Sequence, residues 1–555
     1  MTAFLVANMA PIMFAMLVVF LLSGFPVAFA LAANGLLFGL IGIELGLLKP
    51  ELMQALPNRL FGIMSNNTLL AIPFFTFMGL ILERSGMAED LLETIGQLFG
   101  PLRGGVAYAV IFVGALLAAT TGVVAASVIS MGLISLPIML RYGYDKRVAT
   151  GVIAASGTLA QIIPPSLVLI VMADQLNRSV GDMYQAAFLP GLMLMGLYAL
   201  FIFALSIFRP HTVPALPPEA RSLREPDGSS GVASLLVLIV LGVTAALVFA
   251  SYYRTRHAEA PADEVGIFAA LVGIGIAFLF ALANRLFRAG LVSRLAERVT
   301  FALIPPLGLI FLVLGTIFLG IATPTEGGGM GALGALILAA ANRRLSLPLL
   351  KQAMDSTTRL SCFVIFILIG SSVFSLVFRG VNGDLWVEHL LTSLPGGATG
   401  FLIAVNLLFF VLAFFLDFFE LAFILVPLVG LAAEKFGIDL IWFGVLLSVN
   451  MQTSFMHPPF GFALFYLRSV APREVKTSDI YLGAIPFVLI QLLMVALIIL
   501  FPGLVMVDKK EVASEPLELR LEAPAPGYES EPPRFDAPQF DLAPEEKPAI
   551  DDAAR

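Results

Sequence analysis

Residues 155–166 read Ala-Ser-Gly-Thr-Leu-Ala-Gln-Ile-Ile-Pro-Pro-Ser, and residues 450–461 read Asn-Met-Gln-Thr-Ser-Phe-Met-His-Pro-Pro-Phe-Gly. A proline inside a helix removes a backbone donor and clashes with the preceding turn, so each Pro-Pro pair is expected to break a helix. Both stretches lie in apolar sequence. Carbonyl groups freed at membrane depth must face protein or a watery cavity, because lipid offers no donor. The two stretches therefore predict two broken membrane helices beside a polar interior.

The composition supports a bilayer setting for these breaks. Of 555 residues, 59% are hydrophobic and 13% are charged, whereas soluble chains have about 45–50% apolar and about 25% charged residues. A helix needs roughly 20 apolar residues to cross the hydrocarbon. The chain is therefore predicted to be an all-α integral membrane protein, and without a basic patch interleaved with aromatic residues we expect no nucleic-acid partner. The clearer apolar runs are 12–22, 27–48, 69–82, 184–208, 232–250, 266–283, 300–321, 331–341, 361–378 and 481–505.

The chain repeats itself at a shift of about 294–298 positions. Tyr142-Gly143-Tyr144-Asp145 matches Phe436-Gly437-Ile438-Asp439, and the same shift carries 163–166 onto 457–460. Two halves, about 11–208 and 300–505, therefore share one plan. The predicted domains are a first repeat over 1–208, an insertion over 209–299, a second repeat over 300–507 and a tail over 508–555.

Loop charge orients the two halves. Cytoplasmic loops carry an excess of Lys and Arg, which places the basic loop at 141–147 inside and its counterpart around Lys435 outside. Arg59, Arg178 and Arg379 are assigned to the same outer side. This assignment requires the segments 106–140 and 400–434 each to dip into the membrane and return. Equivalent loops then face opposite sides, as in the inverted-topology repeats of many secondary transporters.

Two segments lie outside the repeat. Residues 209–299 are expected to add two spans, followed by an amphipathic basic helix over 285–299 at the cytoplasmic surface. The tail over 508–555 is acidic and rich in proline, with few large apolar groups. It is predicted to be disordered.

The helix breaks have the chemistry of an ion and anion site. Unwound carbonyl groups and Ser, Thr and Asn oxygens suit Na⁺, and half-helix N-termini present partial positive charge to an anion. The hairpin tips are expected near 120–127 and 417–420. At the second tip, Asp417 and Glu420 are predicted to share a helix face, with Asp417 as cation ligand. The predicted substrate- and ion-binding residues are Thr120, Thr121, Gly122, Ser156, Gly157, Thr158, Pro164, Pro165, Asp417, Glu420, Asn450, Gln452, Thr453, Ser454, Pro458, Pro459 and Gly461, with Na⁺ near Gly157, Thr158, Asp417 and Asn450.

Other polar positions have local explanations. Thr323 and Glu326 flank Pro324 at the spacing of a capping box, and the glycines at 327–329 and 331 permit close helix packing. His457 is interpreted as a packed or cavity-lining residue. Paired cysteines, closely spaced histidines and a phosphate-binding loop are absent from the sequence, so we do not expect an enzyme or a bound cofactor.

Taken together, these motifs resemble the large membrane subunit of tripartite ATP-independent periplasmic (TRAP) transporters. The resemblance covers both repeats, and its marks are the segments 67–75, 157–166, 320–326 and 458–461. It departs from the family at the first tip, where Thr121-Gly122-Val123-Val124 stands in place of Ser-Gly-Ser-Ser. It also departs at His457, which stands where the family usually has Thr.

The resemblance implies sodium-driven import of organic acids, possible keto acids included, by an elevator motion of the domain that carries the hairpins. It implies two partners, a small four-helix TRAP membrane subunit and a periplasmic substrate-binding protein, and a multi-pass position in the bacterial inner membrane. The alternative is a stand-alone Na⁺- or H⁺-coupled organic anion symporter. A membrane enzyme or scaffold would need a cluster of catalytic groups, which the sequence does not offer.

Overall fold

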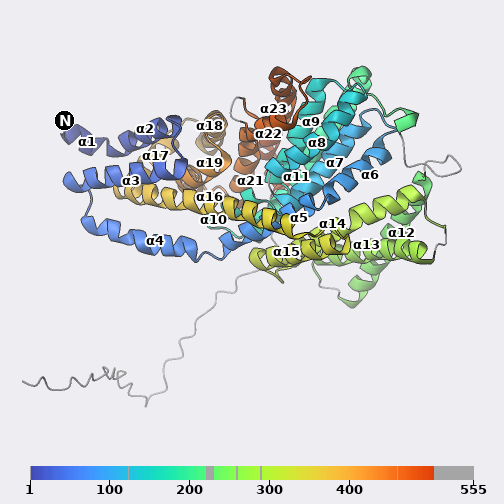
Figure 1. The fold of residues 1–555 in the computed structure, drawn as a ribbon. Helices are drawn as coiled ribbons and strands as arrows, with labels where there is room; N and C mark the ends of the chain where they lie inside the picture. Colours follow the sequence, from blue (N-terminus) through green and yellow to red (C-terminus); the bar gives the residue numbers. More distant parts are fainter. Residues whose placement is uncertain are drawn as a thin grey trace, which may run out of the picture. The chain divides into compact units, whose positions relative to one another are not determined.

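The computed structural model describes residues 2–122, 124–220, 231–257, 260–287, 290–458 and 461–505, and at Thr120 and Thr121 it describes the backbone alone. Throughout these residues the ordered elements are helices (Figure 1). The predicted disordered tail at 508–555 lies outside the described residues, as do Val123, Pro459 and Phe460.

The first half contains α1 (Thr2–Ala7), α2 (Met9–Leu22), α3 (Val27–Glu44), η1 (Pro50–Gln54), α4 (Ala55–Met64), η2 (Thr68–Leu70), α5 (Ala71–Arg84), α6 (Met87–Phe99), α7 (Gly105–Thr121), α8 (Val124–Arg141), α9 (Lys146–Thr158), η3 (Leu159–Gln161), α10 (Leu167–Gln175) and α11 (Val180–Phe208). The short turns η4 (Pro210–Thr212) and η5 (Pro218–Ala220) follow. The helices α12 (Val232–Arg256) and α13 (Ala262–Phe287) form the insertion.

The second half contains α14 (Arg294–Phe318), α15 (Pro324–Ala341), α16 (Leu347–Gly380), α17 (Gly383–Thr392), α18 (Gly397–Leu412), α19 (Phe418–Ile424), α20 (Val426–Lys435), α21 (Leu440–Met451), η6 (Gln452–Met456), α22 (Phe462–Val470), α23 (Thr477–Leu500) and η7 (Pro502–Leu504). The sequence of helices is the same in both halves. In the first half the order is α2, α3, the bent pair α4–α5, the short helix α6, the hairpin α7–α8, the broken helix α9–α10 and the long helix α11. In the second half the corresponding order is α14, α15, α16, α17, the hairpin that starts with α18 and α19, the broken helix α21–α22 and α23.

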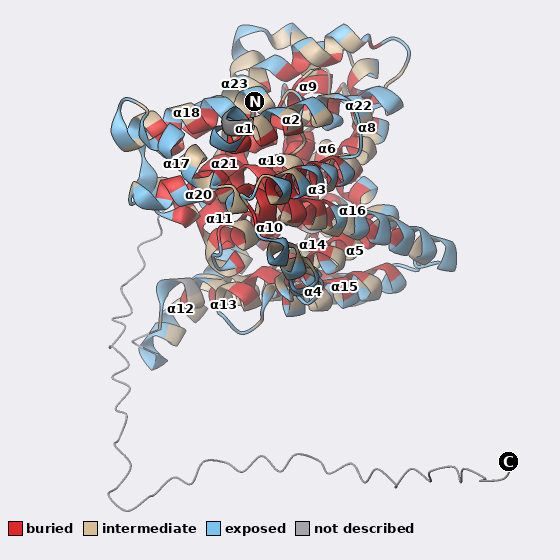
Figure 2. Cartoon of the chain, turned by 90° about the vertical axis from the view of Figure 1, so that its left-hand side faces the viewer, coloured by how far each residue is buried: buried red, intermediate tan, exposed pale blue. Residues whose placement is uncertain are grey.

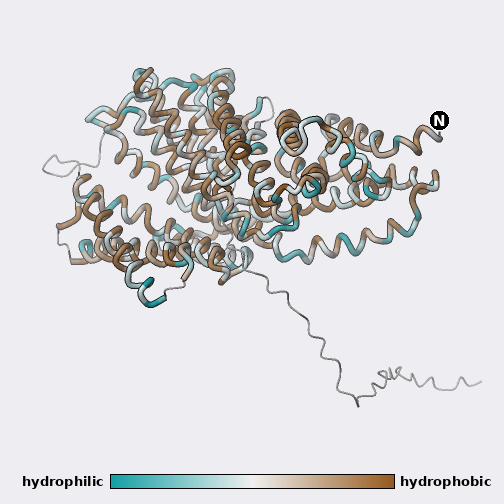
Figure 3. Tube along the Cα trace, turned by 180° about the vertical axis from the view of Figure 1, so that it is seen from behind, coloured by the Kyte–Doolittle hydropathy of each residue, from teal (hydrophilic) through white to brown (hydrophobic). Residues whose placement is uncertain are grey.

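Membrane-spanning character is evident in these helices. In the part of the chain that the structure describes, 8 helices are long and apolar enough to cross a bilayer, or up to 10 if each of two bent pairs counts as one span. Hydrophobic residues run along most helices, including those at the outside (Figure 3). Each apolar run found in the sequence falls mainly on a helix. The prediction of an all-helical membrane protein is confirmed.

Helices of one half pack against counterpart helices of the other. By position in their halves, α3 corresponds to α15 and α5 to α16. The contact of α3 with α16 recurs as a contact of α15 with α5. In the same way, the contact of α10 with α19 recurs as a contact of α22 with α8. The α3–α16 contact is backbone-close, because a Cβ on Gly370 would lie 2.3 Å from the carbonyl oxygen of Ala28. Small residues allow such approach in membrane helices.

The repeated Tyr-Gly-Tyr-Asp and Phe-Gly-Ile-Asp motifs form the same turn in both halves. Gly143 and Gly437 have φ values of +82° and +68°, the left-handed conformation that ends a helix. Asp145 then caps α9 by accepting the N–H groups of Arg147 and Val148. Asp439 caps α21 by accepting two N–H groups in the same way. Each motif therefore ends one helix and starts the next within a few residues.

The predicted surface helix over 285–299 is not observed. Arg285 lies in the last turn of α13, and a new helix, α14, starts at Arg294. The start is fixed by Ser293, whose side chain accepts the N–H of Ala296. Arg285 and Arg294 therefore belong to the ends of two long apolar helices rather than to one helix on the surface.

The core surrounds the first helix break. Residues 167–173 of α10 are all buried, and the buried residues gather around α10, α19 and α21 (Figure 2). At the start of α15, Thr323 and Glu326 form the predicted capping box. Gly327 packs on Ile317, Gly328 on Phe74 and Gly331 on Met78, so the predicted close packing is confirmed at these three positions. It is not observed at Gly329, where a Cβ would meet nothing within 4 Å.

Candidate functional site

The first helix break lies between α9 and α10. The chain leaves η3 at Gln161, passes through the cis peptide Pro164-Pro165, and resumes a helix after Ser166. The Ser166 hydroxyl donates to the Gln161 carbonyl at 2.6 Å and accepts the N–H groups of Val168 and Leu169. Ser156, Thr158 and Ser166 are completely buried. The predicted interruption of the helix at Pro164-Pro165 is therefore confirmed, and the structure adds that it is buried and capped by Ser166.

The second helix break lies between α21 and α22. Gln452, Thr453 and Ser454 lie on the short helix η6 and are buried. The Thr453 hydroxyl donates to the Asn450 carbonyl at 2.7 Å. Pro458 follows in a turn, whereas Pro459 lies outside the described residues. Gly461 then opens α22.

The two breaks meet through their side chains. Gln452 Nε2 donates to Thr158 Oγ1 at 3.0 Å, across 294 positions of sequence. Gln491 Nε2 of α23 donates to the same hydroxyl at 3.4 Å and to the Tyr198 hydroxyl of α11 at 2.9 Å, across 293 positions. The first pair joins positions related by the sequence repeat, and the second joins the corresponding long helices α11 and α23.

The Thr158 hydroxyl is fully engaged within the protein. It donates to the Ala155 carbonyl at 2.8 Å and accepts from two amide groups, and a hydroxyl has one donor and two acceptor positions. The structure therefore gives Thr158 the role of joining the breaks through its side chain.

Several buried amide oxygens on the two breaks and the helices beside them lack a hydrogen-bond partner. In the described part of the chain, buried side-chain oxygens that lack a hydrogen-bond partner include Gln161 Oε1, Asn450 Oδ1, Gln452 Oε1 and Gln491 Oε1. The amide nitrogen of Asn450 is held by the carbonyl and side-chain oxygens of Asn406, at 2.7 and 3.0 Å. Buried polar atoms normally have a partner. These oxygens are hard, neutral donors of the type that an alkali cation accepts.

The first hairpin tip lies on the first break. Gly122, between α7 and α8, has φ +58°, and a Cβ there would lie 3.3 Å from the Pro165 carbonyl oxygen. Gly157 is equally close to the hairpin, because its Cβ would lie 2.3 Å from Val128 of α8. The side chains of Thr120 and Thr121 are outside the described residues. The structure thus places Gly122 against Pro165 of the first break, and Gly157 against Val128 of the same hairpin.

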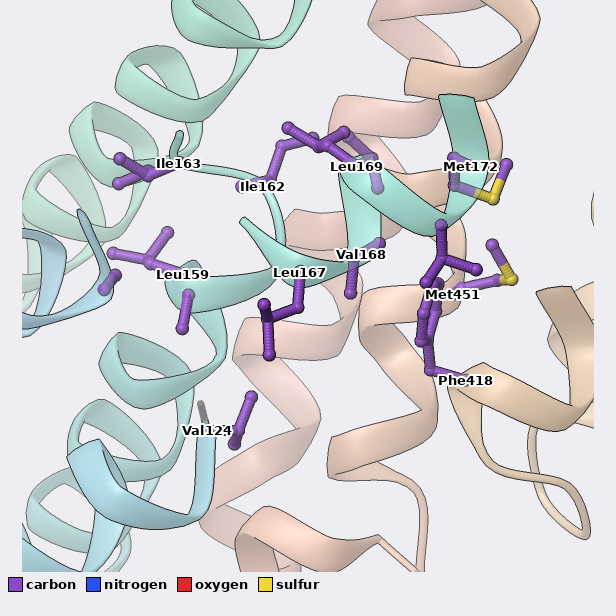
Figure 4. Packing of buried hydrophobic residues seen from close by; sticks show 14 of the residues in the cluster. Val124, Leu159, Ile162, Ile163, Leu167, Val168, Leu169, Met172, Phe418 and Met451 are labelled. Carbon is purple, nitrogen blue, oxygen red and sulfur yellow. The ribbon is translucent and has the colours of Figure 1, made fainter. Parts of the chain in front are cut away.

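The second hairpin tip is organised by its two carboxylates. Asp417 Oδ1 accepts the Glu420 N–H at 2.9 Å, and Glu420 Oε2 accepts the Asp417 N–H at 3.0 Å. This is a capping box at the start of α19. The predicted shared helix face is therefore wrong, because Asp417 is the extended residue that precedes the helix. Phe418 of this tip lies near Met451, Val168 and Met172, so α10 reaches the second tip (Figure 4).

His457 lies between the second break and the second hairpin. Its ring stacks on Phe414 with centroids 4.1 Å apart and meets Phe410 edge-on at 4.6 Å. The residue is 2% exposed. The interpretation of His457 as a packed residue is confirmed.

Sequence reasoning missed three polar residues of this site. Asn406, Tyr198 and Gln491 lie in apolar helices and are buried at the junction of the breaks. The sequence could have identified them, because burying a polar side chain in a membrane segment costs free energy. Such a residue therefore usually faces the protein interior or a functional site. Tyr198 and Gln491 also lie on the corresponding long helices of the two halves, α11 and α23.

Three comparisons relate this chain to known proteins. The family model described as the DctM component of the tripartite ATP-independent periplasmic transporter matches residues 14–504. The C4-dicarboxylate TRAP transporter large permease protein DctM of Pseudomonas aeruginosa is 26% identical over 82% of this chain and 90% of its own length. The ectoine TRAP transporter large permease protein TeaC of Halomonas elongata is 25% identical over 89% of this chain and 97% of its own.

A solved structure is also similar in outline. The YdaH transporter of Alcanivorax borkumensis has 15% sequence identity and a TM-score of 0.48, over 82% of this chain and 90% of that protein.

Proposed function

The chain belongs to the DctM-component family of tripartite ATP-independent periplasmic transporters, and we propose that it is the membrane-conducting subunit of a sodium-driven, binding-protein-dependent importer of small organic acids. The relatives with matching length are large permease proteins of transporters, not enzymes. The membrane permease role follows from family membership; the coupling ion, the substrate class and the mechanism are the content of the proposal.

The observation that carries the proposal is the junction of the two helix breaks. The two breaks and the helix ends beside them carry the buried, unpartnered oxygens Gln161 Oε1, Asn450 Oδ1 and Gln452 Oε1. Unwound helix carbonyls and such oxygens coordinate Na⁺ in secondary transporters. Asn450 is the residue we assign to the cation, because its nitrogen is anchored on Asn406 and its oxygen is left without a partner. Thr158 positions Gln452 instead of binding the ion.

The hairpin tips supply the remaining parts of the proposed site. Asp417 is the charged member, at the N-terminus of α19, and Gly122 lets the first tip approach Pro165. The N-termini of α10 and α22 lie directly after the breaks. Helix N-termini favour anions, so a carboxylate substrate is assigned to this end of the site, and the cation to the amide oxygens.

An inverted repeat with two re-entrant hairpins fits the helix packing. A two-fold relation between halves exchanges α3 with α15 and α16 with α5, so the α3–α16 contact must recur as α15–α5, which it does. The same exchange relates α10–α19 to α22–α8. The distribution of basic loops, which favours opposite orientations of the halves, supports the inversion.

An elevator motion requires a moving group and a static group. The hairpins and broken helices pack among themselves and on α11 and α23, whereas α3, α5, α15 and α16 pack among themselves. The two groups also touch where α5 packs on α7 and α16 packs on α19, and there Phe363 meets Phe419 edge-on with ring centroids 6.0 Å apart. Some of the side-chain links across this boundary are polar. Ser130 donates to Glu83 at 2.8 Å, and Ser371 donates to the Phe423 carbonyl at 2.6 Å. Such links can break and re-form as one group slides, whereas interlocked apolar packing resists sliding.

The proposed partners are a small four-helix membrane subunit and a periplasmic substrate-binding protein, and the proposed location is the bacterial inner membrane. Reconstitution of the chain in liposomes, with and without each partner, tests this assembly. Uptake of radiolabelled carboxylates, keto acids included, should require all three components. Uptake by this chain alone would instead assign it to the stand-alone anion symporters.

A further inference from the structure

A second polar cavity lies away from the helix breaks. Its volume is about 350 Å³, and it is bounded by the α4–α5 bend, the end of α10, α16 and the α19–α20 corner. Its polar lining includes Arg59, Arg379, Asp174, Asn66 and Ser375. These elements come from both the static and the moving group, so the cavity lies on the boundary between them.

Two arginines face this cavity without a carboxylate partner. Among the ion pairs of the described residues, neither Arg59 nor Arg379 takes part. Both guanidinium-bearing side chains line the same cavity. Asp174, the carboxylate in the lining, accepts the side-chain amides of Asn66 at 2.7 Å and Gln175 at 2.9 Å. With two arginines and one aspartate, the lining carries a net positive charge. Neither arginine has a carboxylate partner within the described part of the chain.

The cavity faces the outside in the orientation that the loop charges favour, because Arg59 and Arg379 fall in segments assigned to that side. The opposite mouth has the opposite charge. A cavity of about 560 Å³ between α5, α6 and α8 is lined by Glu83, Glu89 and Ser130. Glu83 precedes Arg379 by 296 positions, the shift of the repeat.

Basic residues near the inner cavity are already engaged. Arg84 donates to Gln352 and Ser356, and Arg344 pairs with Asp90 at 2.8 Å. A dicarboxylate moving inward would therefore pass from the basic cavity at Arg59 and Arg379 toward the acidic cavity at Glu83 and Glu89. Charged, low-dielectric clefts concentrate ligands of opposite charge.

We propose that the cavity between Arg59 and Arg379 is an outer capture site for a small dicarboxylate, with one carboxylate on each guanidinium. Its role in capturing substrate for inward transport rests on the proposed function, whereas the binding of a dicarboxylate in this cavity does not. Arginine suits this role because its planar fork meets a carboxylate through two parallel hydrogen bonds. Ser375 and Asn66 add neutral polar groups to the lining.

Equilibrium binding of radiolabelled succinate to the full chain in lipid nanodiscs tests the site. Succinate should bind, more weakly at high salt, and Arg59→Gln and Arg379→Gln should each raise the Kd of this site at least about tenfold. The double variant should lose this component of the binding and keep only what the site at the helix breaks contributes. The control is Arg178→Gln. Arg178 is assigned to the same side, pairs with Glu434 at 3.9 Å and does not line the cavity; its variant should bind like the wild type. Thermal unfolding of each variant checks that it is folded.

Two results would overturn the site. One is the absence of succinate binding to the wild type, and the other is equal Kd values for the wild type and the double arginine variant. If the double variant loses only binding-protein-dependent uptake while it keeps succinate binding, the arginines belong to a docking surface for that protein. Binding is measured on this chain alone and without an ion gradient. Its outcome therefore tests the arginine site even if the three-component transport assay fails.

Discussion

Gln452 Nε2 donates a hydrogen bond to Thr158 Oγ1 at 3.0 Å, so the two helix breaks touch through residues 294 positions apart. Position 158 plus the repeat shift is position 452, which places each residue at its counterpart's place in the other half. A contact between repeat-related residues lies at or near a two-fold axis. The junction of the breaks is therefore also the centre of the repeat.

The first prediction concerns this junction. Thr158→Val keeps the side-chain shape but removes the hydroxyl acceptor. The buried Gln452 Nε2 then loses its hydrogen-bond partner, whereas Gln491 Nε2 keeps its bond to Tyr198. We expect a loss of about 1–3 kcal/mol in the free energy of unfolding, measured by thermal unfolding of the purified protein. Thr158→Ser keeps the hydroxyl and should recover most of the loss. Equal stability of the Val variant and the wild type would show that the hydroxyl does not hold the breaks together.

The second prediction assigns the cation to Asn450. Asn450→Ala removes the unpartnered Oδ1 and should raise the Na⁺ concentration for half-maximal uptake about tenfold, a loss of about 1.4 kcal/mol in ion binding. Ser448→Ala is the matched control. Ser448 is buried on the same helix, and its hydroxyl donates to the Gly444 carbonyl of its own helix. Its variant should keep the wild-type Na⁺ dependence. An unchanged Na⁺ requirement in Asn450→Ala would remove this ligand from the proposal.

The third prediction separates charge from capping at the second hairpin tip. Asn is as good an N-cap as Asp, so Asp417→Asn should keep membrane insertion and stability but weaken Na⁺-dependent uptake. The capping box at Thr323 provides the control, because Glu326→Gln makes the same kind of change away from the helix breaks and should leave uptake unaltered. If Asp417→Asn transports like the wild type, the carboxylate serves the helix start alone.

The fourth prediction tests the elevator motion. Glu83 and Ser130 are hydrogen-bonded across the boundary between the static and moving groups. A Glu83→Cys, Ser130→Cys pair, in a Cys362→Ser background that removes the native cysteine, should lose uptake on oxidation and regain it on reduction. Arg147 and Asp479, 3.9 Å apart within the moving group, provide the control pair. Uptake that persists through a completed 83–130 cross-link would exclude sliding at this boundary.

Local signals account for what the sequence predicted well. The helix ends at Gly143 and Gly437 and the caps at Asp145 and Asp439 depend on residues within one turn. The Pro-Pro breaks are equally local, since a proline interrupts the helix that contains it. These features could be placed by residue number without knowledge of the fold.

Tertiary choices account for what it missed. Whether Thr158 binds an ion or another side chain depends on Gln452 and Gln491, and these come from a different half of the chain. The basic segment 285–299 looked amphipathic because two helix ends were read as one helix. The cap at Ser293 decided otherwise. The placement of Arg59 beside Arg379 likewise follows only from packing of α4 and α16.

The driving ion is the most direct test of the central claim. The organic acid taken up best by the three-component liposomes should be measured under an inward Na⁺ gradient, under equal Na⁺ on both sides, and under an inward proton gradient without Na⁺. The account predicts accumulation against the substrate gradient under the first condition alone. Accumulation driven by protons in the absence of Na⁺ would contradict a sodium site at the junction of the two helix breaks.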